Sequence, residues 1–486
     1  MKYLNQDQIL SRTSQAALAR FTPVLVSMAL AAVLSACSNS ANSPTATAAG
    51  PQLYMSPAMV GGAGAGVTDG QATYSIDDKA LLPTFVQQTY ALNNAQTGAQ
   101  VNYSGDLVTL SRGWLELGIS YCNSTRLVSC TAGSTYNPPL TGSGWAVELA
   151  GQAGGLLQMT GQPFTPLVPA VTCPSMSTAE TFLFVTLPNG RVTSGTYTRG
   201  WNPQLETAYG SVDVTASGST VTFGNINQYI LPSEGGGKTP GAPTSMTGAC
   251  STTVFGNTVA VPANPTITID PTGTETITPQ AMIGIGPSGL LIEDNNSGRS
   301  KAPFYENVLG AGTGAIGLPR PTSTLDTSSL LSAQYQGFIL GSGSYDSSRS
   351  SSFNWASLPV SFGFPSLPAN CSSIAPQTST MLYGGDFRNN DPSSSAAGYG
   401  NCDFAIDLGA PDKSTNGLFP AATVYVGTGF STNTAGTIGC GLTTGYCFHA
   451  VAIAGQLGGK YAIFLIGEDT TGSPNQAWGV YLLQSN

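Results

Sequence analysis

The sequence predicts an all-β protein, and three observations support this class. Short runs of β-branched and aromatic residues recur along the chain, with Gly, Pro, Asn and Ser between them. Only 8% of the residues are charged while 41% are hydrophobic, so Ser, Thr, Asn, Gln and Gly must cover the exposed strand faces. No segment after residue 40 keeps a helical period over three turns, and residues 81–93 and 325–334 come nearest. We therefore expect about two dozen short strands.

The clearest strand candidates combine apolar or alternating patterns with turn residues at both ends. They are residues 107–110, 145–149, 181–187, 266–269, 461–466 and 478–483. A β-hairpin is predicted from residues 211–214 and 220–223, because Ala216-Ser217-Gly218-Ser219 separates two alternating runs.

Four sequence landmarks occur twice in the same order. The first copies begin at residues 173, 208, 250 and 287, and the second copies begin at residues 371, 398, 440 and 462. This spacing favours two related β halves, residues 67–293 and 294–486. Chance similarity among strand and turn sequences of limited vocabulary is the alternative explanation.

Two architectures fit about two dozen strands in two related halves. A six-bladed propeller with three blades in each half is favoured, because each blade is a four-stranded sheet. Two tandem β-sandwich or barrel domains are the alternative.

The N-terminus has the layout of a secretory signal. Lys2, Arg12 and Arg20 precede an apolar run that ends in Leu34-Ser35-Ala36-Cys37. This tetrad resembles the lipobox of bacterial lipoproteins. An uncleaved membrane anchor is the alternative, but the run is shorter than the roughly 20 apolar residues that a spanning helix needs.

The resemblance implies that residues 1–36 are a signal peptide and that Cys37 becomes lipidated. Several acyl chains would hold the protein stably to a membrane, which would be its partner through Cys37. Ser38 suggests sorting to the outer membrane of a Gram-negative bacterium. Residues 37–66 are rich in Ser, Ala, Gly and Pro, and we expect a flexible tether there.

Eight cysteines remain when Cys37 is set aside, and in an exported protein they predict four disulfides. Position within the proposed repeat favours the pairs Cys173–Cys250 and Cys371–Cys440. Cys402 and Cys447 correspond to two non-cysteine positions of the first half and would form a third bridge. Nearness in the sequence favours the fourth pair, Cys122–Cys130. The cysteines expected to form bridges are thus Cys122, Cys130, Cys173, Cys250, Cys371, Cys440, Cys402 and Cys447.

Common catalytic patterns are missing from the sequence. It has no G-x-S-x-G nucleophile turn and no Cys or His spacing typical of zinc. The Asp-Thr/Ser-Gly turns of aspartic proteases are missing too. The single histidine, His449, lies in an apolar run and is interpreted as a strand residue. We therefore expect no catalytic residues, no metal and no cofactor.

Three further motifs have a structural interpretation that we favour. Two acidic pairs, Glu293-Asp294 and Glu468-Asp469, end predicted strands and are interpreted as solvated strand ends rather than glycosidase acids. Residues 294–298 begin like a calcium loop but lack its distal glutamate. Residues 284–289 are rich in glycine and predict a turn rather than a phosphate-binding loop.

The acidic composition of the chain limits the classes of partner that it can bind. The net charge of −9 excludes the basic surface that nucleic-acid binding needs, so no nucleic-acid partner is expected. The favoured hypothesis is a non-enzymatic envelope lipoprotein that binds an extracytoplasmic ligand or another envelope component. The alternative is a carbohydrate-active or other hydrolase that uses Asp and Glu side chains.

Overall fold

Strands dominate the part of the chain that can be described. The computed structural model describes residues 52–60, 68–77, 84–91, 96–104, 115–117, 145–149, 154–159, 165–169, 175–187, 208–238, 244–250, 258–262, 267–270, 273–275, 280–285, 289–295, 315–342, 355–363, 371–375, 378–386, 402–426, 446–469 and 476–484. These residues form strands β1 to β26 and a few short helices. The predicted all-β class is confirmed.

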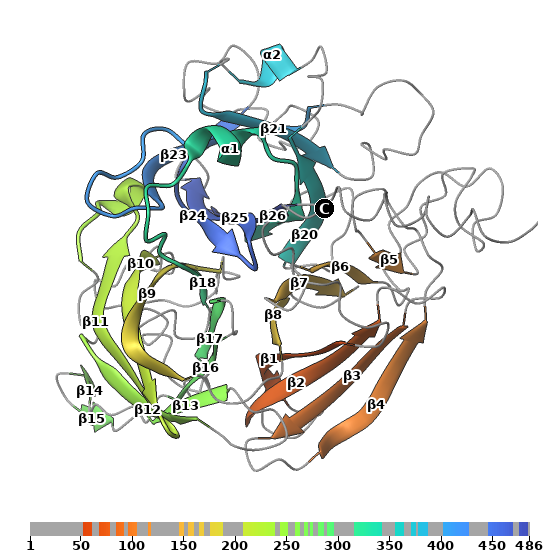
Figure 1. The fold of residues 1–486 in the computed structure, drawn as a ribbon, viewed down its shortest axis with the longest axis vertical. Helices are drawn as coiled ribbons and strands as arrows, with labels where there is room; N and C mark the ends of the chain where they lie inside the picture. Colours follow the sequence, from red (N-terminus) through yellow and green to blue (C-terminus); the bar gives the residue numbers. More distant parts are fainter. Residues whose placement is uncertain are drawn as a thin grey trace, which may run out of the picture. The chain divides into compact units, whose positions relative to one another are not determined.

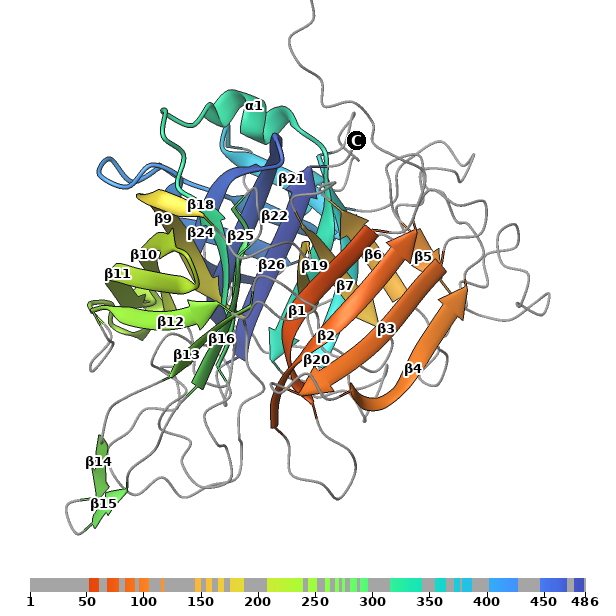
Figure 2. The ribbon, with the colours of Figure 1, turned by 60° about the horizontal axis from the view of Figure 1, so that its bottom comes forward.

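The first sheet contains eight antiparallel strands in the order β4-β3-β2-β1-β8-β7-β6-β5. Figure 2 shows β1 to β4 side by side. Strands that follow each other in the chain are neighbours except for β4 and β5, which form the two edges, and β1 pairs with β8. Its strands are β1 (Gln52–Val60), β2 (Thr68–Asp77), β3 (Thr84–Ala91), β4 (Gln96–Ser104), β5 (Leu115–Leu117), β6 (Trp145–Leu149), β7 (Gly155–Met159) and β8 (Thr165–Pro169).

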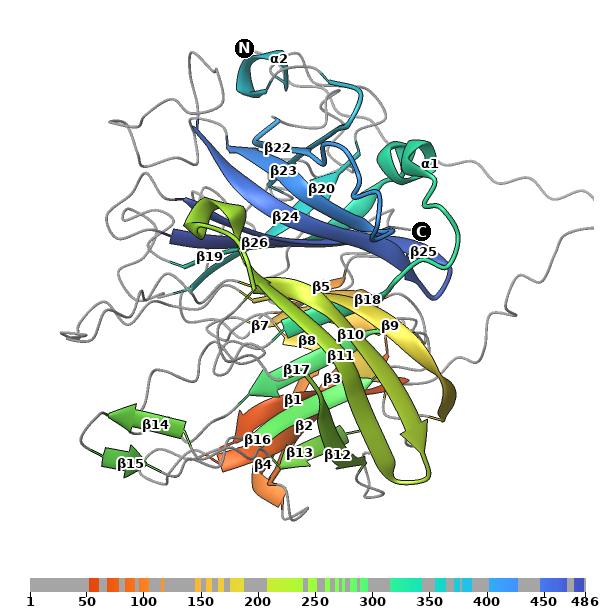
Figure 3. The ribbon, with the colours of Figure 1, turned by 90° about the vertical axis from the view of Figure 1, so that its left-hand side faces the viewer.

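Barrel I is a closed sheet of eight antiparallel strands, in which the last strand pairs with the first. The predicted β10–β11 hairpin is confirmed and is prominent in Figure 3, but its strands extend further than expected and only two residues, Gly218 and Ser219, connect them. A separate small hairpin, β14 (Ile267–Asp270) and β15 (Gly273–Glu275), interrupts the strand order. The barrel strands are β9 (Met176–Thr186), β10 (Ala208–Ser217), β11 (Thr220–Ile230), β12 (Met246–Cys250), β13 (Thr258–Pro262), β16 (Gln280–Ile285), β17 (Leu291–Asn295) and β18 (Ala315–Pro319).

Barrel II repeats this topology with β19 to β26, closed by pairing between β26 and β19. Figure 1 shows its strands arranged in a ring. Its strands are β19 (Tyr335–Ser342), β20 (Trp355–Phe362), β21 (Met381–Asp386), β22 (Phe404–Asp407), β23 (Leu418–Val426), β24 (Tyr446–Leu457), β25 (Lys460–Asp469) and β26 (Gln476–Gln484).

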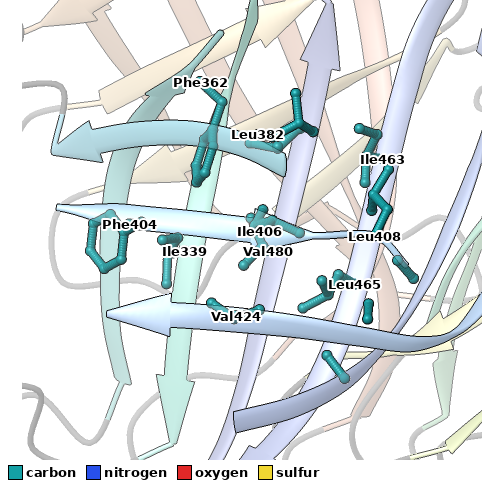
Figure 4. Packing of buried hydrophobic residues seen from close by; sticks show 14 of the residues in the cluster. Ile339, Phe362, Leu382, Phe404, Ile406, Leu408, Val424, Ile463, Leu465 and Val480 are labelled. Atoms are coloured by element: carbon teal, nitrogen blue, oxygen red, sulfur yellow. The ribbon is translucent and has the colours of Figure 1, made fainter. Parts of the chain in front are cut away.

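The interior of barrel II is packed with apolar side chains. Alternate residues of each strand point inward, because side chains of a strand alternate between its two faces. Figure 4 shows side chains of this cluster, among them Ile406 and Leu465, in the space between the strands. Helix α1 (Thr327–Ser332) adds Leu330 to this core, and the Tyr335 hydroxyl donates a hydrogen bond to the Leu330 carbonyl at 2.5 Å. A packed interior leaves the outer faces of the barrel to carry function.

A second apolar cluster lies on the outer faces of the barrels, where they pack against each other, and we call it the seam. Barrel I contributes Leu183 and Ile316, and barrel II contributes Val451, Phe464 and Tyr481. The first sheet adds side chains from β7 and β8. Strands β9, β24, β25 and β26 are therefore apolar on both faces, as in sheets that are covered on both sides.

Four features differ from the sequence-based expectations. The six-bladed propeller is not shown, whereas the alternative of tandem barrel domains is compatible with the two closed barrels. The expected boundary between residues 293 and 294 falls inside β17, the seventh strand of barrel I. Strand β1 occupies residues that we expected in the flexible tether. Of the two helix candidates, residues 81–93 contain β3, and residues 325–334 contain α1.

Among the residues that the structure describes, none belongs to a helix that is both long enough and apolar enough to cross a membrane.

Candidate binding site

A pocket of about 290 Å³ opens beside the seam, and we call it the seam pocket. Barrel I contributes the residues that follow β11, and barrel II contributes parts of β23 and β24. The lining residues are Leu231, Pro232, Ser233, Pro420, Ala421, His449 and Ala450.

Barrel I builds its wall of the pocket with a short 3-10 helix, η3 (Pro232–Glu234). Pro232 stands at the start of this helix, where its fixed φ is favourable and its missing N–H costs nothing. Gly235 ends the helix with a left-handed φ of 106°, which glycine adopts without strain. The chain therefore turns sharply after β11 and presents Ser233 to barrel II.

Barrel II builds the opposite wall with an irregularity in β23. The register between β23 and β24 shifts between Phe419 and Ala422, so Pro420 and Ala421 are out of the regular ladder. A proline has no N–H to donate, and within sheets it is found at edges and bulges. Ala421 is exposed at this point.

Two polar side chains stand out in a pocket that is otherwise apolar. The Ser233 hydroxyl oxygen is buried and has no hydrogen-bond partner. His449 is exposed, because its neighbours Phe448 and Ala450 point into barrel II and His449 points outward. The imidazole can both donate and accept hydrogen bonds. Ligand pockets commonly pair an apolar lining with a few such groups and lie at domain interfaces.

Ser233 and His449 are not hydrogen-bonded to each other in the pocket. A catalytic serine needs a hydrogen bond to the base that takes its proton. The Ser233 hydroxyl makes no hydrogen bond, to His449 or to any other group. The two residues therefore offer a ligand two separate polar contacts.

The acidic pairs of the sequence belong to different barrels. Glu293 and Asp294 are in β17 of barrel I, and Glu468 and Asp469 end β25 of barrel II. Glu468 is the register partner of His449. The positions of these four side chains lie outside what the structure describes, so their interpretation as solvated strand ends stays a prediction.

The disulfide map differs from the expected one. Cys371 is bonded to Cys402, with 5.0 Å between their Cα atoms, so the predicted pairs Cys371–Cys440 and Cys402–Cys447 are both wrong. The short helix α2 (Cys371–Ile374) brings Cys371 against β21 and β22, where both cysteines join a buried cluster with Tyr383. Proximity created by the fold, rather than order within a repeat, selects this partner.

Two other cysteines are also oxidised. These are Cys250 and Cys447, which are both disulfide-bonded. The predicted Cys173–Cys250 and Cys122–Cys130 pairs stay predictions, because Cys122, Cys130 and Cys173 lie outside those ranges, as does Cys440.

The remaining sequence motifs are only partly described. Cys37 and residues 296–298 of the calcium-like segment lie outside the described ranges. The glycine-rich segment 284–289 joins β16 to its antiparallel neighbour β17, in agreement with the turn interpretation. Within the described ranges, no group of three or more His, Cys, Asp or Glu side chains is placed to hold a metal ion.

Sequence reasoning missed most of the pocket. It identified His449 as a strand residue, which is correct, but did not predict that this strand position would border a pocket. Ser233 carried no signal beyond its place in a turn-rich segment, Leu231-Pro232-Ser233-Glu234-Gly235. Comparison with known proteins adds no assignment, since no protein-family model and no curated protein matches the chain.

Proposed function

We propose that this protein is a lipid-anchored protein of the cell envelope that binds a small extracytoplasmic ligand in the seam pocket and does not catalyse a reaction. The observation that carries the proposal is the pocket itself, an apolar hollow at a domain junction with Ser233 and His449 as its polar groups. The anchor is supported by the Leu34-Ser35-Ala36-Cys37 tetrad and by the oxidised cysteines, which are typical of exported proteins.

The packing of barrel II makes the outer surface the better place for a ligand. Some eight-stranded barrels hold a small ligand inside, while others are filled by their own side chains. Barrel II is filled by large side chains that are almost fully buried, such as Phe362, Phe404 and Trp478. A ligand inside would have to displace them.

The ligand class follows from the lining. Leu231, Pro420 and Ala421 favour an apolar body, and burial of that body supplies the driving force for binding. The Ser233 hydroxyl makes no hydrogen bond within the protein, so a ligand group that reaches it would satisfy a buried polar atom. A small amphipathic molecule with one hydrogen-bonding or anionic group meets both conditions.

The anchor is tested by replacing the lipidation site in the full-length chain. We expect Cys37→Ala to abolish acyl labelling and to release the protein from the membrane fraction, since the acyl chains supply the membrane affinity. Ser38→Ala keeps the cysteine and serves as the control that stays in the membrane fraction. Continued sedimentation of Cys37→Ala with membranes after a high-salt wash would refute lipidation as the anchor.

The pocket is tested with a fluorescent amphipathic probe, 1-anilinonaphthalene-8-sulfonate, added to the folded protein. We expect the fluorescence to rise on binding and Ala421→Trp to reduce the affinity by about tenfold or more, because the indole fills the hollow. The matched control is Ala410→Trp, which places the same side chain at an exposed alanine outside the pocket lining. Equal binding by both variants would contradict the proposed site.

A further inference from the structure

The outer face of the β10–β11 hairpin carries partly exposed aromatic and polar side chains, and we call it the tyrosine–amide face. It consists of two tyrosines and a line of polar side chains that continues along the hairpin. Its residues are Tyr209, Ser211 and Asp213 on β10, Asn225, Asn227 and Tyr229 on β11, with Lys238 beside them. The inward residues of the same strands, such as Val212 and Phe223, belong to the core of barrel I.

The aromatic end of the face is a pair of stacked rings. Tyr209 and Tyr229 are register partners on the two strands, and their ring centroids lie 5.6 Å apart with 28° between the ring planes. Both rings are partly exposed. The pKa of Tyr209 is raised by partial burial and by the neighbouring Tyr229 and Asp412, so its hydroxyl stays protonated at neutral pH. The pair offers apolar ring surface with polar tips.

The polar end of the face is held in place by its own hydrogen bonds. Asp213 accepts from the Thr181 hydroxyl at 2.6 Å and from the Asn225 amide at 2.8 Å. The Asn227 amide donates to the Asn225 carbonyl at 2.9 Å, and its oxygen accepts from Lys238 at 3.3 Å. Each carboxylate oxygen can accept more than one hydrogen bond, so Asp213 keeps capacity for a ligand. A ligand therefore meets planar groups whose orientation is already fixed, which lowers the entropic cost of binding.

A bulge gives the polar end its shape. The register of β10 and β11 shifts between Ser211 and Asp213, and Asn225 sits at the shift with a left-handed φ of 47°. Within the described ranges it is the only residue other than glycine with a positive φ. Bulges re-aim side chains, and strain of this kind is concentrated at functional sites. The neighbouring Gly224 leaves the surface open, because a Cβ built there meets no atom within 4 Å.

Charge decides which polymers suit this face. Asp213 and Asp412 are acidic, and Lys238 is the basic residue that the hydrogen bonds place there. The chain as a whole carries a net charge of −9. Nucleic acids and sulfated or phosphorylated glycans would be repelled, since binding them requires clustered Lys and Arg. A neutral ligand rich in hydroxyl groups meets no such penalty.

We propose that the tyrosine–amide face binds the pyranose rings of a neutral polysaccharide. The apolar face of a sugar ring packs on the tyrosine pair, and sugar hydroxyls donate to Asp213 and accept from the amides of Asn225 and Asn227. This site is separate from the seam pocket and does not depend on the function proposed for that pocket.

The test is calorimetric titration of the folded protein with chitohexaose, cellohexaose and maltohexaose, with heparin as the anionic comparison. We expect at least one neutral hexasaccharide to bind with a dissociation constant below about 1 mM, and heparin to bind more weakly. Tyr229→Ala should weaken that binding about tenfold or more, while Tyr229→Phe, which keeps the ring, should change it by less than about threefold. Tyr229 is preferred to Tyr209, which packs against the seam.

A second pair of variants separates binding from folding. Gly224→Leu adds a side chain to the open surface beside Asp213 and should weaken binding about tenfold or more without loss of thermal stability. Thr220→Leu adds the same side chain at an exposed position near the hairpin turn and should leave binding unchanged.

Four results would each overturn the proposal. They are the absence of binding by all three neutral hexasaccharides, tighter binding of heparin, equal affinity of Tyr229→Ala and wild type, and equal affinity of Gly224→Leu and Thr220→Leu. Retention of sugar binding by Ala421→Trp would confirm that the two sites are separate.

Discussion

Strands β25 and β10 have the same topological setting but different outer faces. Both are antiparallel strands of closed eight-stranded barrels whose inward side chains form an apolar core. The outer face of β25 carries Phe464 and Ile466, which are buried in the seam. The outer face of β10 carries Tyr209 and Asp213, which are partly exposed.

This difference in burial distinguishes an outer face that stabilises the fold from an outer face that is available to a ligand. An outer face buried in the seam contributes to stability and is unavailable to a ligand. An open outer face contributes little to stability, so its sequence is free to present rings, amides and carboxylates. The seam pocket lies where the buried and the open outer faces meet. His449 and Val451 point to the same outer side of β24, but Val451 is buried in the seam and His449 is exposed.

The largest expected effect concerns the buried outer face. Phe464 is 0% exposed, and Phe464→Ala should lower the free energy of unfolding by about 3–5 kcal/mol through lost burial and the cavity left behind. Thr215→Ala, on the partly exposed outer face of β10, should change it by less than about 0.5 kcal/mol. Urea unfolding of both variants measures the contrast, and equal effects would abolish the distinction between the two faces.

The second prediction concerns the disulfide Cys371–Cys402, which lies on the outer face of β21 and β22 in barrel II. Its removal by the paired substitutions Cys371→Ala and Cys402→Ala should cost about 3.5 kcal/mol of unfolding free energy, from the entropy of a loop of 31 residues. Chemical denaturation under non-reducing conditions measures this. A loss below about 1 kcal/mol would mean that the α2 cluster contributes little to holding that face.

Backbone strain on the open face predicts a smaller effect. Asn225→Gly and Asn225→Ala both remove the amide, but only alanine keeps a Cβ in the left-handed conformation. Asn225→Gly should therefore be more stable than Asn225→Ala by about 1 kcal/mol. Thermal unfolding of the two variants gives the difference. Equal stability would show that the bulge relaxes freely and stores no strain.

The smallest effect concerns Asp326, which caps α1, the helix that precedes β19. Hydrogen bonds from the Ser329 side chain and backbone and from the Ser328 backbone hold the pKa of this carboxyl below its usual value. Because the folded-state pKa is lowered, the stabilisation is present above the unfolded pKa of about 3.9 and is lost as the pH falls through the lowered value.

The comparison for this cap is Asp326→Asn, which keeps a capping oxygen but does not titrate. We expect the melting temperature of wild type to exceed that of Asp326→Asn slightly at pH 7 and to match it near pH 2. A difference that grows as the pH falls would have the wrong sign for this account.

The local sequence pattern predicted many of the strands, but it did not predict how the strands close into barrels. Alternation and turn residues were sufficient for the β10–β11 hairpin, because its contacts are close in sequence. The pairing of β18 with β9, which closes barrel I, joins residues more than a hundred positions apart and leaves no local signal. A run such as Tyr461-Ala462-Ile463-Phe464-Leu465 indicates burial on both faces without indicating what covers the second face.

The proposed duplication illustrates the same limit. The strand after Cys173 is the first of barrel I, whereas the strand after Cys371 is the third of barrel II. The landmark at residues 287–294 and its counterpart at residues 462–469 fall in the seventh strand of each barrel. The landmarks therefore do not occupy equivalent places throughout, and the likeness of the barrels lies in strand order instead.

The candidate site was the least predictable part. Its walls come from two segments, Leu231-Pro232-Ser233 and Pro420-Ala421, which approach only because two barrels pack together. A proline inside β23 does signal an irregular ladder. The sequence contains no signal for the element that faces it.

The single histidine makes the seam pocket directly measurable. His449 is the only histidine of the chain, so isotope labelling of histidine gives one imidazole whose resonances need no assignment. We predict that 1-anilinonaphthalene-8-sulfonate shifts these resonances in wild type and in Ala410→Trp, and not in Ala421→Trp. Unchanged imidazole resonances in wild type, at probe concentrations that raise its fluorescence, would contradict the assignment of the seam pocket as the binding site.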